Sequence, residues 1–442
     1  MTRFPKTLFV ETTTRCNLSC AMCARCRPGW LDGFGDMDFA LFERLDGAVR
    51  HAHAVILNGM GEPLLHPELP RMVRFVSERL PEGGWCGLQT NGLLLDQGLA
   101  FDLASAGLDV ACMSYEWPSA GEWPATGAAL GHAPDASADA QDDPLARFAG
   151  LMRAAAAKAG RPMRLGLETV LMRGNIARLP ELVDRAAALG LDFLLASHLL
   201  PMDAASEAES LFLPCSATAL RLFSRYQQEA GARGLDLASV PKAAVMYHRS
   251  PAEQDLMDLL LRMRKQAQEE GVWLNVARLA GTDPGDLGAL EEIFAEARRR
   301  AGAAGLELSL PPLTAPERPE DRRCGFMERE AAFIDWQGNI SPCHFLWHGY
   351  SCRVLGDEKR VEPRRFGNIS ATALEDVWTG AESAAFREAA RAGEYPACGD
   401  CGAGLCSDAT GIYGPFEQDC LGVSVPCGHC PWSVRQLMCL GS

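Results

Sequence analysis

The placement of cysteines is the feature that most constrains this chain of 442 residues. It has 17 cysteines, and four of them, Cys16, Cys20, Cys23 and Cys26, lie close together near the start. Ten more lie between Cys324 and Cys439. No apolar run of signal-peptide length opens the sequence, so we expect a reducing compartment, where clustered thiols usually bind metal. The cysteines therefore predict metal centres at both ends of the chain.

Length and charge narrow the class of protein. The length predicts two or three packed units, and 48% hydrophobic with 22% charged residues is typical of a globular protein. The formal charge of −15 disfavours a broad phosphate-binding face, so we expect no nucleic-acid partner. No stretch is long and apolar enough to span a bilayer, which predicts a cytoplasmic protein with no membrane partner.

The first two hundred residues alternate short apolar runs with segments of helical spacing. The expected strands cover 7–11, 54–57, 85–89, 108–114, 163–171 and 193–197, and the expected helices cover 39–49, 68–79, 97–106, 144–159 and 179–189. This repeat predicts parallel strands with right-handed crossovers, in an α/β barrel or an open doubly wound sheet. In a barrel, the chemistry belongs at the carboxyl ends of the strands.

The same pattern predicts three units. We expect a barrel in residues 1–200, a helical bridge in 201–322 and a small Cys-rich domain in 323–442. The bridge carries two expected helices, 252–270 and 286–301, and a closing strand at 306–310. We expect residues 116–143 to form a long surface insertion, either a lid or a disordered segment.

The cysteines near the start have the spacing C-x3-C-x2-C, at Cys16, Cys20 and Cys23, directly after the first expected strand. Three thiolates can hold three irons of a [4Fe–4S] cluster and leave the fourth iron open to another ligand. Cys26 could instead saturate the cluster and give an electron carrier, and zinc is a further alternative. The open iron is our main hypothesis, because an electron carrier needs no six-stranded barrel.

This motif resembles that of the radical S-adenosylmethionine (SAM) superfamily in spacing and position. The resemblance implies a partial (β/α)6 barrel, with Cys16, Cys20 and Cys23 holding a cluster whose open iron binds SAM. Met22 replaces the usual aromatic residue and is expected to pack on the adenine. The segment from Gly59 to Pro63 is similar to the superfamily's Gly-Gly-Glu-Pro motif. The resemblance implies SAM contacts from the ends of four further strands: Gly61, Glu62, Pro63, Asn91, Ser114, Glu116 and Arg173.

The segment from Gly338 to Cys343 resembles the SPASM domain, which binds auxiliary iron–sulfur clusters. Two clusters need eight thiolates, so the ten cysteines of this region leave two spare. The candidate ligands are Cys324, Cys343, Cys352, Cys398, Cys401, Cys406, Cys420, Cys427, Cys430 and Cys439. Their assignment to each cluster stays open at this stage, and a pair of zinc ribbons is the alternative.

Segments 335–343 and 419–432 are similar to a branch of SPASM proteins described as maturases of tungsten-cofactor aldehyde oxidoreductases. The resemblance implies a tungsten or molybdenum oxidoreductase, or a pterin cofactor intermediate, as target, and an electron donor of the ferredoxin or flavodoxin type. A peptide-modifying enzyme and a multi-cluster electron-transfer protein are the alternatives. No acid or base is assigned: Tyr115, Glu168 and His198 lie near strand ends, where structural roles are expected.

Overall fold

The computed structural model describes residues 2–27, 30, 32–116, 143–282, 285–401, 406, 410–411 and 414–441. Most of the expected insertion, residues 117–142, lies outside these described residues.

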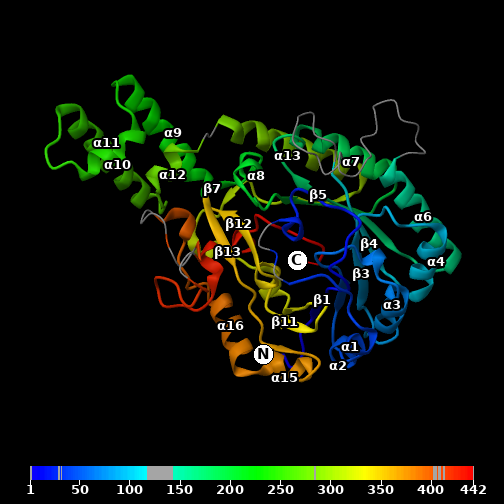
Figure 1. Cartoon of the computed structure of the whole chain (residues 1–442). Coiled ribbons are helices and arrows are strands. Elements are labelled where there is room, and N and C mark those ends of the chain that lie inside the picture. The colour runs from blue at the N-terminus through cyan, green and yellow to red at the C-terminus, as the bar shows by residue number, and fades with distance from the viewer. Residues whose placement is uncertain are drawn as a thin grey trace.

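Six parallel strands form the centre of the molecule (Figure 1). They are β1 (Thr7–Val10), β2 (Ala54–Leu57), β3 (Trp85–Thr90), β4 (Val110–Ser114), β5 (Arg164–Leu171) and β6 (Phe193–His198). Each pairs with the next along the chain, as the alternating pattern predicts. The fold is therefore a partial α/β barrel, and each expected strand is confirmed to within two residues at either end.

Helices cover the outer face of these strands. They are α1 (Phe39–Glu43), α2 (Asp46–Val49), α3 (Leu69–Ser77), α4 (Gln97–Ala106), α6 (Pro144–Ala159) and α7 (Leu179–Ala188). The prediction of one helix over 39–49 is wrong, because α1 and α2 are separate. Asp46 and Gly47 are poor residues for a helix interior, and Asp46 instead occupies the first turn of α2, where the helix dipole favours a carboxylate.

Strands from later in the sequence extend both edges of this sheet. β8 (Glu307–Ser309) pairs with β6, which confirms the expected closing strand. β10 (Ala331–Ile334) pairs in parallel with β1, and β11 (Asn339–Ser341) and β14 (Gly367–Asn368) continue the same sheet. The Cys-rich region thus shares its main sheet with the barrel.

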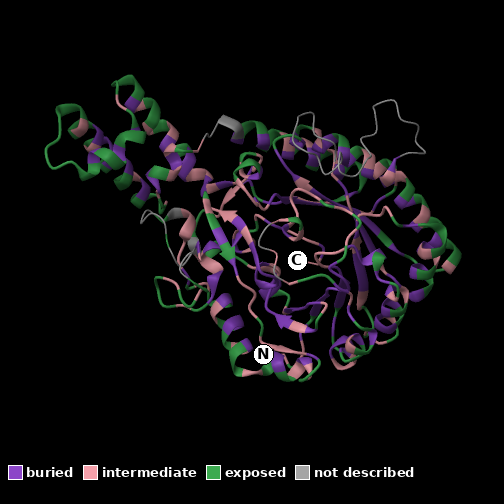
Figure 2. Ribbon diagram, in the orientation of Figure 1, coloured by how far each residue is buried: buried purple, intermediate pink, exposed green. Residues whose placement is uncertain are grey.

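Aromatic side chains from the Cys-rich region pack inside the barrel. Phe9 on β1 and Phe333 on β10 stack with ring centroids 4.6 Å apart. Phe326, Phe345 and other buried residues of the same cluster join them. Figure 2 shows these central strands as mostly buried. The barrel interior is therefore a packed core on this side.

The carboxy-terminal segment also enters the barrel, and Figure 1 shows the C-terminus within the ring of strands. The Met438 N–H donates to Ser197 Oγ at 3.0 Å, and the His198 N–H donates to the Gln436 carbonyl at 3.1 Å. A Cβ atom at Gly441 would lie 2.8 Å from Ile56 Cδ1, so the tail approaches β2 closely.

The bridge has more structure than the pattern predicts. Its elements are α8 (Ala204–Ala208), β7 (Leu213–Ser216), α9 (Ala217–Ala232), α10 (Val240–Val245), α11 (Pro251–Glu269), α12 (Val276–Ala280), α13 (Gly285–Ala304) and β9 (Thr314–Ala315). The two expected helices, α11 and α13, are confirmed. α9 was missed, since its apolar stripe is interrupted by polar residues. Figure 1 shows α9 to α12 as an arm projecting from the barrel.

The remaining elements surround the Cys-rich region. They are α14 (Gly325–Glu328), β12 (Tyr350–Val354), β13 (Asp357–Val361), α15 (Leu374–Thr379) and α16 (Ala381–Ala392). β12 and β13 form an antiparallel hairpin. Among the described helices, none has the length and apolar character needed to cross a membrane.

Candidate active site

The thiol loop, residues 16–26, follows β1. Cys16, Cys20 and Cys23 are partly exposed, and turns close the backbone from the Cys23 N–H to the Cys20 carbonyl and from the Cys26 N–H to the Cys23 carbonyl. Burial, together with the nearby Cys16 and Cys26 thiols, raises the pKa of Cys20 to about 11. The loop therefore holds its thiols close together, as a cluster site requires.

Cys26 belongs to this group as well. Its side chain is hydrogen-bonded to that of Cys23, and this bond, with smaller effects from Arg25 and Arg27, lowers the pKa of Cys26 to about 6. Cysteine side chains are the donor type that holds an iron–sulfur cluster, although among the described residues no three potential ligands are already placed to bind one metal ion. The structure thus brings the fourth thiol beside the motif.

Glu62 lies in the loop after β2 and is 2% exposed. Its carboxylate accepts hydrogen bonds from Thr90 Oγ1 at 2.6 Å, the Asn91 N–H at 2.7 Å and the Leu64 N–H at 3.0 Å. Burial raises the pKa of Glu62. The expected SAM contact is therefore a carboxylate engaged within the protein, where it joins this loop to the end of β3.

Gly61 lies against the backbone of residues 13–15, just before the thiol loop. A Cβ atom there would be 2.3 Å from the Thr13 carbonyl oxygen and 2.5 Å from that of Arg15. The next residue donates its N–H to the Arg15 carbonyl at 2.7 Å. Only glycine permits this approach. Pro63 is buried at the start of a short 3-10 helix, Pro63–Leu65.

Asn91 and Ser114 lie at the ends of β3 and β4. Asn91 Nδ2 donates to Asn17 Oδ1 at 2.9 Å, which connects β3 to the residue after Cys16. Ser114 Oγ accepts a hydrogen bond from Gln89 Nε2 at 3.1 Å. Both side chains are partly exposed, so the structure brings these two predicted residues to the same edge as the thiol loop.

Two carboxylates, Glu116 just after β4 and Glu168 within β5, have raised pKa values. Burial raises the pKa of Glu116 to about 8 and that of Glu168 to about 7. Glu116 accepts the Val170 N–H at 3.0 Å. Glu168 Oε2 is buried and has no hydrogen-bond partner among the described residues. The sequence predicts a structural role for Glu168, but in the described part of the chain its Oε2 atom accepts no hydrogen bond.

Asn58 was not predicted at all. It follows β2, is 8% exposed, and its Oδ1 atom is buried without a hydrogen-bond partner in the described part of the chain. Side chains alternate along a strand, so Asn58 shares the barrel-facing side with Ile56. Glu168 lies two residues after Gly166 on β5, so it too faces the interior of the barrel. Strand periodicity was thus the signal that could have found both residues.

Met22 and Arg173 lie apart from these contacts. Met22 is partly buried between Cys20 and Cys23. Arg173 is exposed after β5, its backbone N–H donates to the Glu209 carbonyl at 3.1 Å, and its side chain lines a cavity next to the Cys-rich region.

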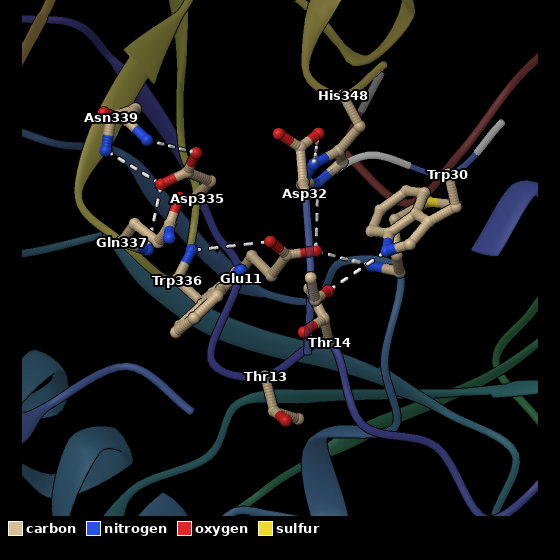
Figure 3. Close-up of polar contacts among 12 residues, drawn as sticks. Glu11, Thr13, Thr14, Trp30, Asp32, Asp335, Trp336, Gln337, Asn339 and His348 are labelled. Carbon is tan, nitrogen blue, oxygen red and sulfur yellow. Dashed lines mark hydrogen bonds and ion pairs between the residues drawn. The ribbon is translucent and has the colours of Figure 1, made fainter. Parts of the chain in front are cut away.

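A buried polar network connects β1 with the Cys-rich region (Figure 3). Glu11 is fully buried at the end of β1. Its Oε1 atom accepts the Met60 N–H at 2.9 Å and lies 3.1 Å from His348 Nε2. The other ring nitrogen of His348, Nδ1, lies 3.0 Å from Asp32 Oδ2, and Arg365 also pairs with Asp32, at 2.5 Å. Met60 precedes Gly61, so this network holds the predicted SAM-binding loop.

His348 is charged in this network. Burial alone would lower the pKa of His348, but the Glu11 and Asp32 carboxylates outweigh it and raise that pKa to about 9. Burial would raise the pKa of Asp32, but hydrogen bonds from His348 and Gly349 lower it to about 2. Sequence reasoning missed Glu11 and His348, since they are 337 positions apart.

The carboxy-terminal thiols lie in two groups. The pKa of Cys430 is raised first by burial and then by Cys343 and Cys324. The pKa of Cys427 is raised first by burial and then by Cys430, Cys324 and Cys343. The pKa of Cys398 is raised by burial to about 12, with contributions from Cys401, Cys406 and Cys420. We name these sets group A (Cys324, Cys343, Cys427, Cys430) and group B (Cys398, Cys401, Cys406, Cys420).

Other thiols have different neighbours. Cys352 is fully buried beside Lys359, and Cys439 Sγ lies 3.5 Å from His344 Nδ1. Burial lowers the pKa of Lys359 to about 8, although thiols of both groups act against this. Cys86, Cys112 and Cys215 are buried.

Comparisons with known proteins identify two domains in this chain. Residues 10–118 match the radical SAM superfamily, and residues 324–402 match SPASM, an iron–sulfur cluster-binding domain. A Pyrococcus furiosus protein named tungsten-containing aldehyde ferredoxin oxidoreductase cofactor-modifying protein is 28% identical over 437 residues, covering 98% of this chain and 97% of the relative.

The solved structures include SuiB from Streptococcus suis, which is 14% identical. It has a TM-score of 0.50, and the match covers 94% of this chain and 76% of SuiB. This likeness supports the fold alone. The two domain matches lead to one conclusion: the chain carries a radical SAM domain in residues 10–118 and a SPASM iron–sulfur domain in residues 324–402, and it is a SAM-dependent iron–sulfur enzyme.

Proposed function

We propose that this enzyme reductively cleaves SAM in order to mature a metalloenzyme or its tungsten or molybdenum pterin cofactor. The observation that carries the proposal is the Pyrococcus furiosus relative, whose name describes modification of a tungsten enzyme's cofactor. Its similarity extends over nearly the whole of both chains, so it includes the barrel, the bridge and the Cys-rich region.

Cys16, Cys20 and Cys23 would hold a [4Fe–4S] cluster and leave one iron for SAM. When bound, the cluster and SAM supply a carbon-centred radical that abstracts hydrogen from the substrate. The protein's own part is to orient SAM and to exclude water. Cys26, beside Cys23, is assigned no ligand role in this proposal.

Residues at the strand ends would orient SAM. Asn58 Oδ1, a buried acceptor with no partner in the described residues, suits the SAM ammonium group, which can only donate. The close approach at Gly61 brings the backbone of this loop to the residues just before the thiol loop. Glu62 mainly holds this loop against the end of β3, because its carboxylate already accepts three hydrogen bonds.

Further contacts follow from the family motif. Met22 would pack on the adenine, and Asn91, Ser114 and Glu116 would meet the ribose and the methionine carboxylate. Pro63 shapes the loop, while Arg173 is an alternative partner for the carboxylate.

Groups A and B would each hold one auxiliary [4Fe–4S] cluster. Lys359 lies among thiols of both groups, so its charge acts on both clusters. The auxiliary clusters would pass electrons or anchor the substrate, and a ferredoxin or flavodoxin would supply electrons at low potential.

Two measurements test the proposal. Anaerobically reconstituted protein should hold about twelve irons per chain and convert SAM to 5′-deoxyadenosine and methionine. Deletion of the gene should then lower the activity and metal occupancy of the host's tungsten or molybdenum oxidoreductases. Normal oxidoreductases in the deletion strain would reject the maturase role and favour a peptide-modifying enzyme. Protein that holds its clusters but never cleaves SAM would indicate electron transfer.

A further inference from the structure

Two arginines of the same segment hold the backbone of the thiol loop. Arg25 Nη2 donates to the Leu18 carbonyl, which lies between the first two cysteines of the motif. Arg27 directly follows the loop, and its Nη2 donates to the Ala21 carbonyl, between the second and third cysteines. Each spacer of the C-x3-C-x2-C motif therefore has one carbonyl that a guanidinium group fixes in place.

Arg27 also connects this loop to the bridge. Its Nη1 lies 2.9 Å from Asp203 Oδ2, so the guanidinium contacts the loop with one nitrogen and the bridge with the other. The planar fork of an arginine suits such a double contact, which the single ammonium of a lysine would hold less rigidly. The two side chains are 26% and 40% exposed, and salt screens a partly buried pair less than a surface pair.

Asp203 divides its carboxylate between Arg27 and α8. Its Oδ1 accepts the Ser206 N–H at 2.8 Å as the N-cap of α8, and the Asp203 N–H donates to Ser206 Oγ at 2.9 Å. Hydrogen bonds from Ser206, followed by the charge of Arg27, lower the pKa of Asp203. The loop is therefore connected to an ionised side chain that the first turn of α8 holds in place.

The same short helix is connected to the SPASM hairpin, β12–β13. Glu207 Oε2 on α8 pairs with Arg353 Nε on β12 at 2.6 Å. The backbone N–H of Arg353 donates to the Pro201 carbonyl at 2.7 Å, just before α8. Two ion pairs thus meet on one helix, one from the thiol loop and one from the SPASM domain.

This arrangement has a consequence for ligand binding. A loop that occupies its productive position in only a fraction of the molecules binds its ligand more weakly, in proportion to that fraction. A contact that fixes the thiol loop should therefore act on the affinity for SAM, whereas saturating SAM itself selects the productive position.

We propose that Arg27 and Asp203 are positioning residues, which hold the thiol loop in place for SAM binding. The pair of Glu207 with Arg353 holds α8 on the SPASM hairpin, so α8 links the positions of the two iron–sulfur domains. This inference rests on the proposed function in taking the thiol loop as the SAM-binding cluster site. It is independent of the metalloenzyme or cofactor that is the substrate.

Asp203→Asn tests the connection to the loop, because asparagine keeps an Oδ1 acceptor for the N-cap and removes the charge that pairs with Arg27. In cluster-loaded protein, calorimetry should show SAM binding about fivefold weaker, as expected for the loss of one partly exposed ion pair. In SAM cleavage, KM for SAM should rise to match while kcat is unchanged. Asp96→Asn, the same change at the N-cap of α4, is the matched control and should bind SAM like the wild type. Wild-type affinity in Asp203→Asn would overturn the proposal.

A double-variant cycle separates positioning from a general loss of structure. Arg27→Gln should weaken SAM binding more than Asp203→Asn does, because it also removes the charged contact to the Ala21 carbonyl. Adding Asp203→Asn to Arg27→Gln should weaken binding no further, since the pair is already broken. Additive effects of the two substitutions would show that the two residues do not act as a pair.

Hydrogen exchange read by mass spectrometry follows the loop without SAM. In Asp203→Asn, the peptide covering residues 16–27 should exchange several-fold faster than in the wild type, and Glu207→Gln should give a smaller increase in the same peptide. Unchanged exchange in Asp203→Asn would reject the connection to the loop, and unchanged exchange in Glu207→Gln alone would reject the connection to the hairpin. If the wild type binds no SAM while these differences in exchange persist, only the proposed function fails.

Discussion

The two ends of the chain build their thiol sites in opposite ways. Near the start, one loop after β1 carries Cys16, Cys20, Cys23 and Cys26, so neighbours in sequence are neighbours in space. In the SPASM region, group A joins Cys324 to Cys430 across more than a hundred residues. In a local loop, the spacing of the cysteines is enough to identify the ligands. In a dispersed site, the ligands come together only when the chain folds.

The sharpest test of this contrast is at the thiol loop. Cys16→Ala, Cys20→Ala and Cys23→Ala should each abolish SAM cleavage and lower the iron content by about four per chain, because a cluster with two thiolates is poorly held. Cys26→Ala should keep measurable cleavage and nearly full iron. Iron analysis and 5′-deoxyadenosine production measure both effects.

If Cys26→Ala loses cleavage as completely as the other three, the open-iron hypothesis is wrong. The loop would then hold a cluster saturated by four thiolates.

The second test separates the dispersed groups. Cys343→Ala in group A and Cys398→Ala in group B should each remove about four irons, and the double variant about eight. SAM cleavage should persist in all three variants, because the thiol loop is intact. Loss of about eight irons from either single variant would show that groups A and B are not independent sites.

Local patterns account for what the sequence predicted. The six strands and the thiol loop follow from spacing within a few residues, and Gly61 follows from the resemblance of its segment to the superfamily's motif. The pairing of β10 with β1 and the packing of the carboxy-terminal tail inside the barrel depend on contacts across more than two hundred residues. Spacing alone also left the auxiliary ligands unassigned, since their distances along the chain are not their distances in space.

The two regions also depend on each other, which gives a third test. His348→Gln should weaken SAM binding several-fold, since His348 supports Glu11, and Glu11 holds the Met60 N–H beside Gly61. The change should lower the free energy of unfolding by about 3 kcal/mol, because Glu11 loses its charged partner in a buried site. His248→Gln, the same change on the exposed arm, is the control and should alter neither quantity.

The pH dependence of the free energy of unfolding tests whether His348 is charged in the folded protein. The folded pKa of His348, about 9, exceeds the ordinary histidine value of about 6.5. Its contribution is therefore complete below about pH 6.5 and is lost as the pH rises through about 9. Denaturant unfolding between those pH values should show a smaller decline in His348→Gln than in the wild type. Parallel curves would indicate that His348 is neutral in the folded protein.

The smallest effect is expected at the two carboxy-terminal cysteines outside groups A and B. Cys352→Ser and Cys439→Ser should keep about twelve irons and full SAM cleavage, because groups A and B already supply eight thiolates for two clusters. Cys352 lies beside Lys359 rather than in either group, and Cys439 contacts His344, so each substitution should cost only the modest stability typical of a buried thiol replaced by a hydroxyl. A loss of about four irons from one variant would place that cysteine among the ligands and exclude one member of group A or B. The contrast between a local and a dispersed thiol site would survive that result, but the assignment of the dispersed ligands would change.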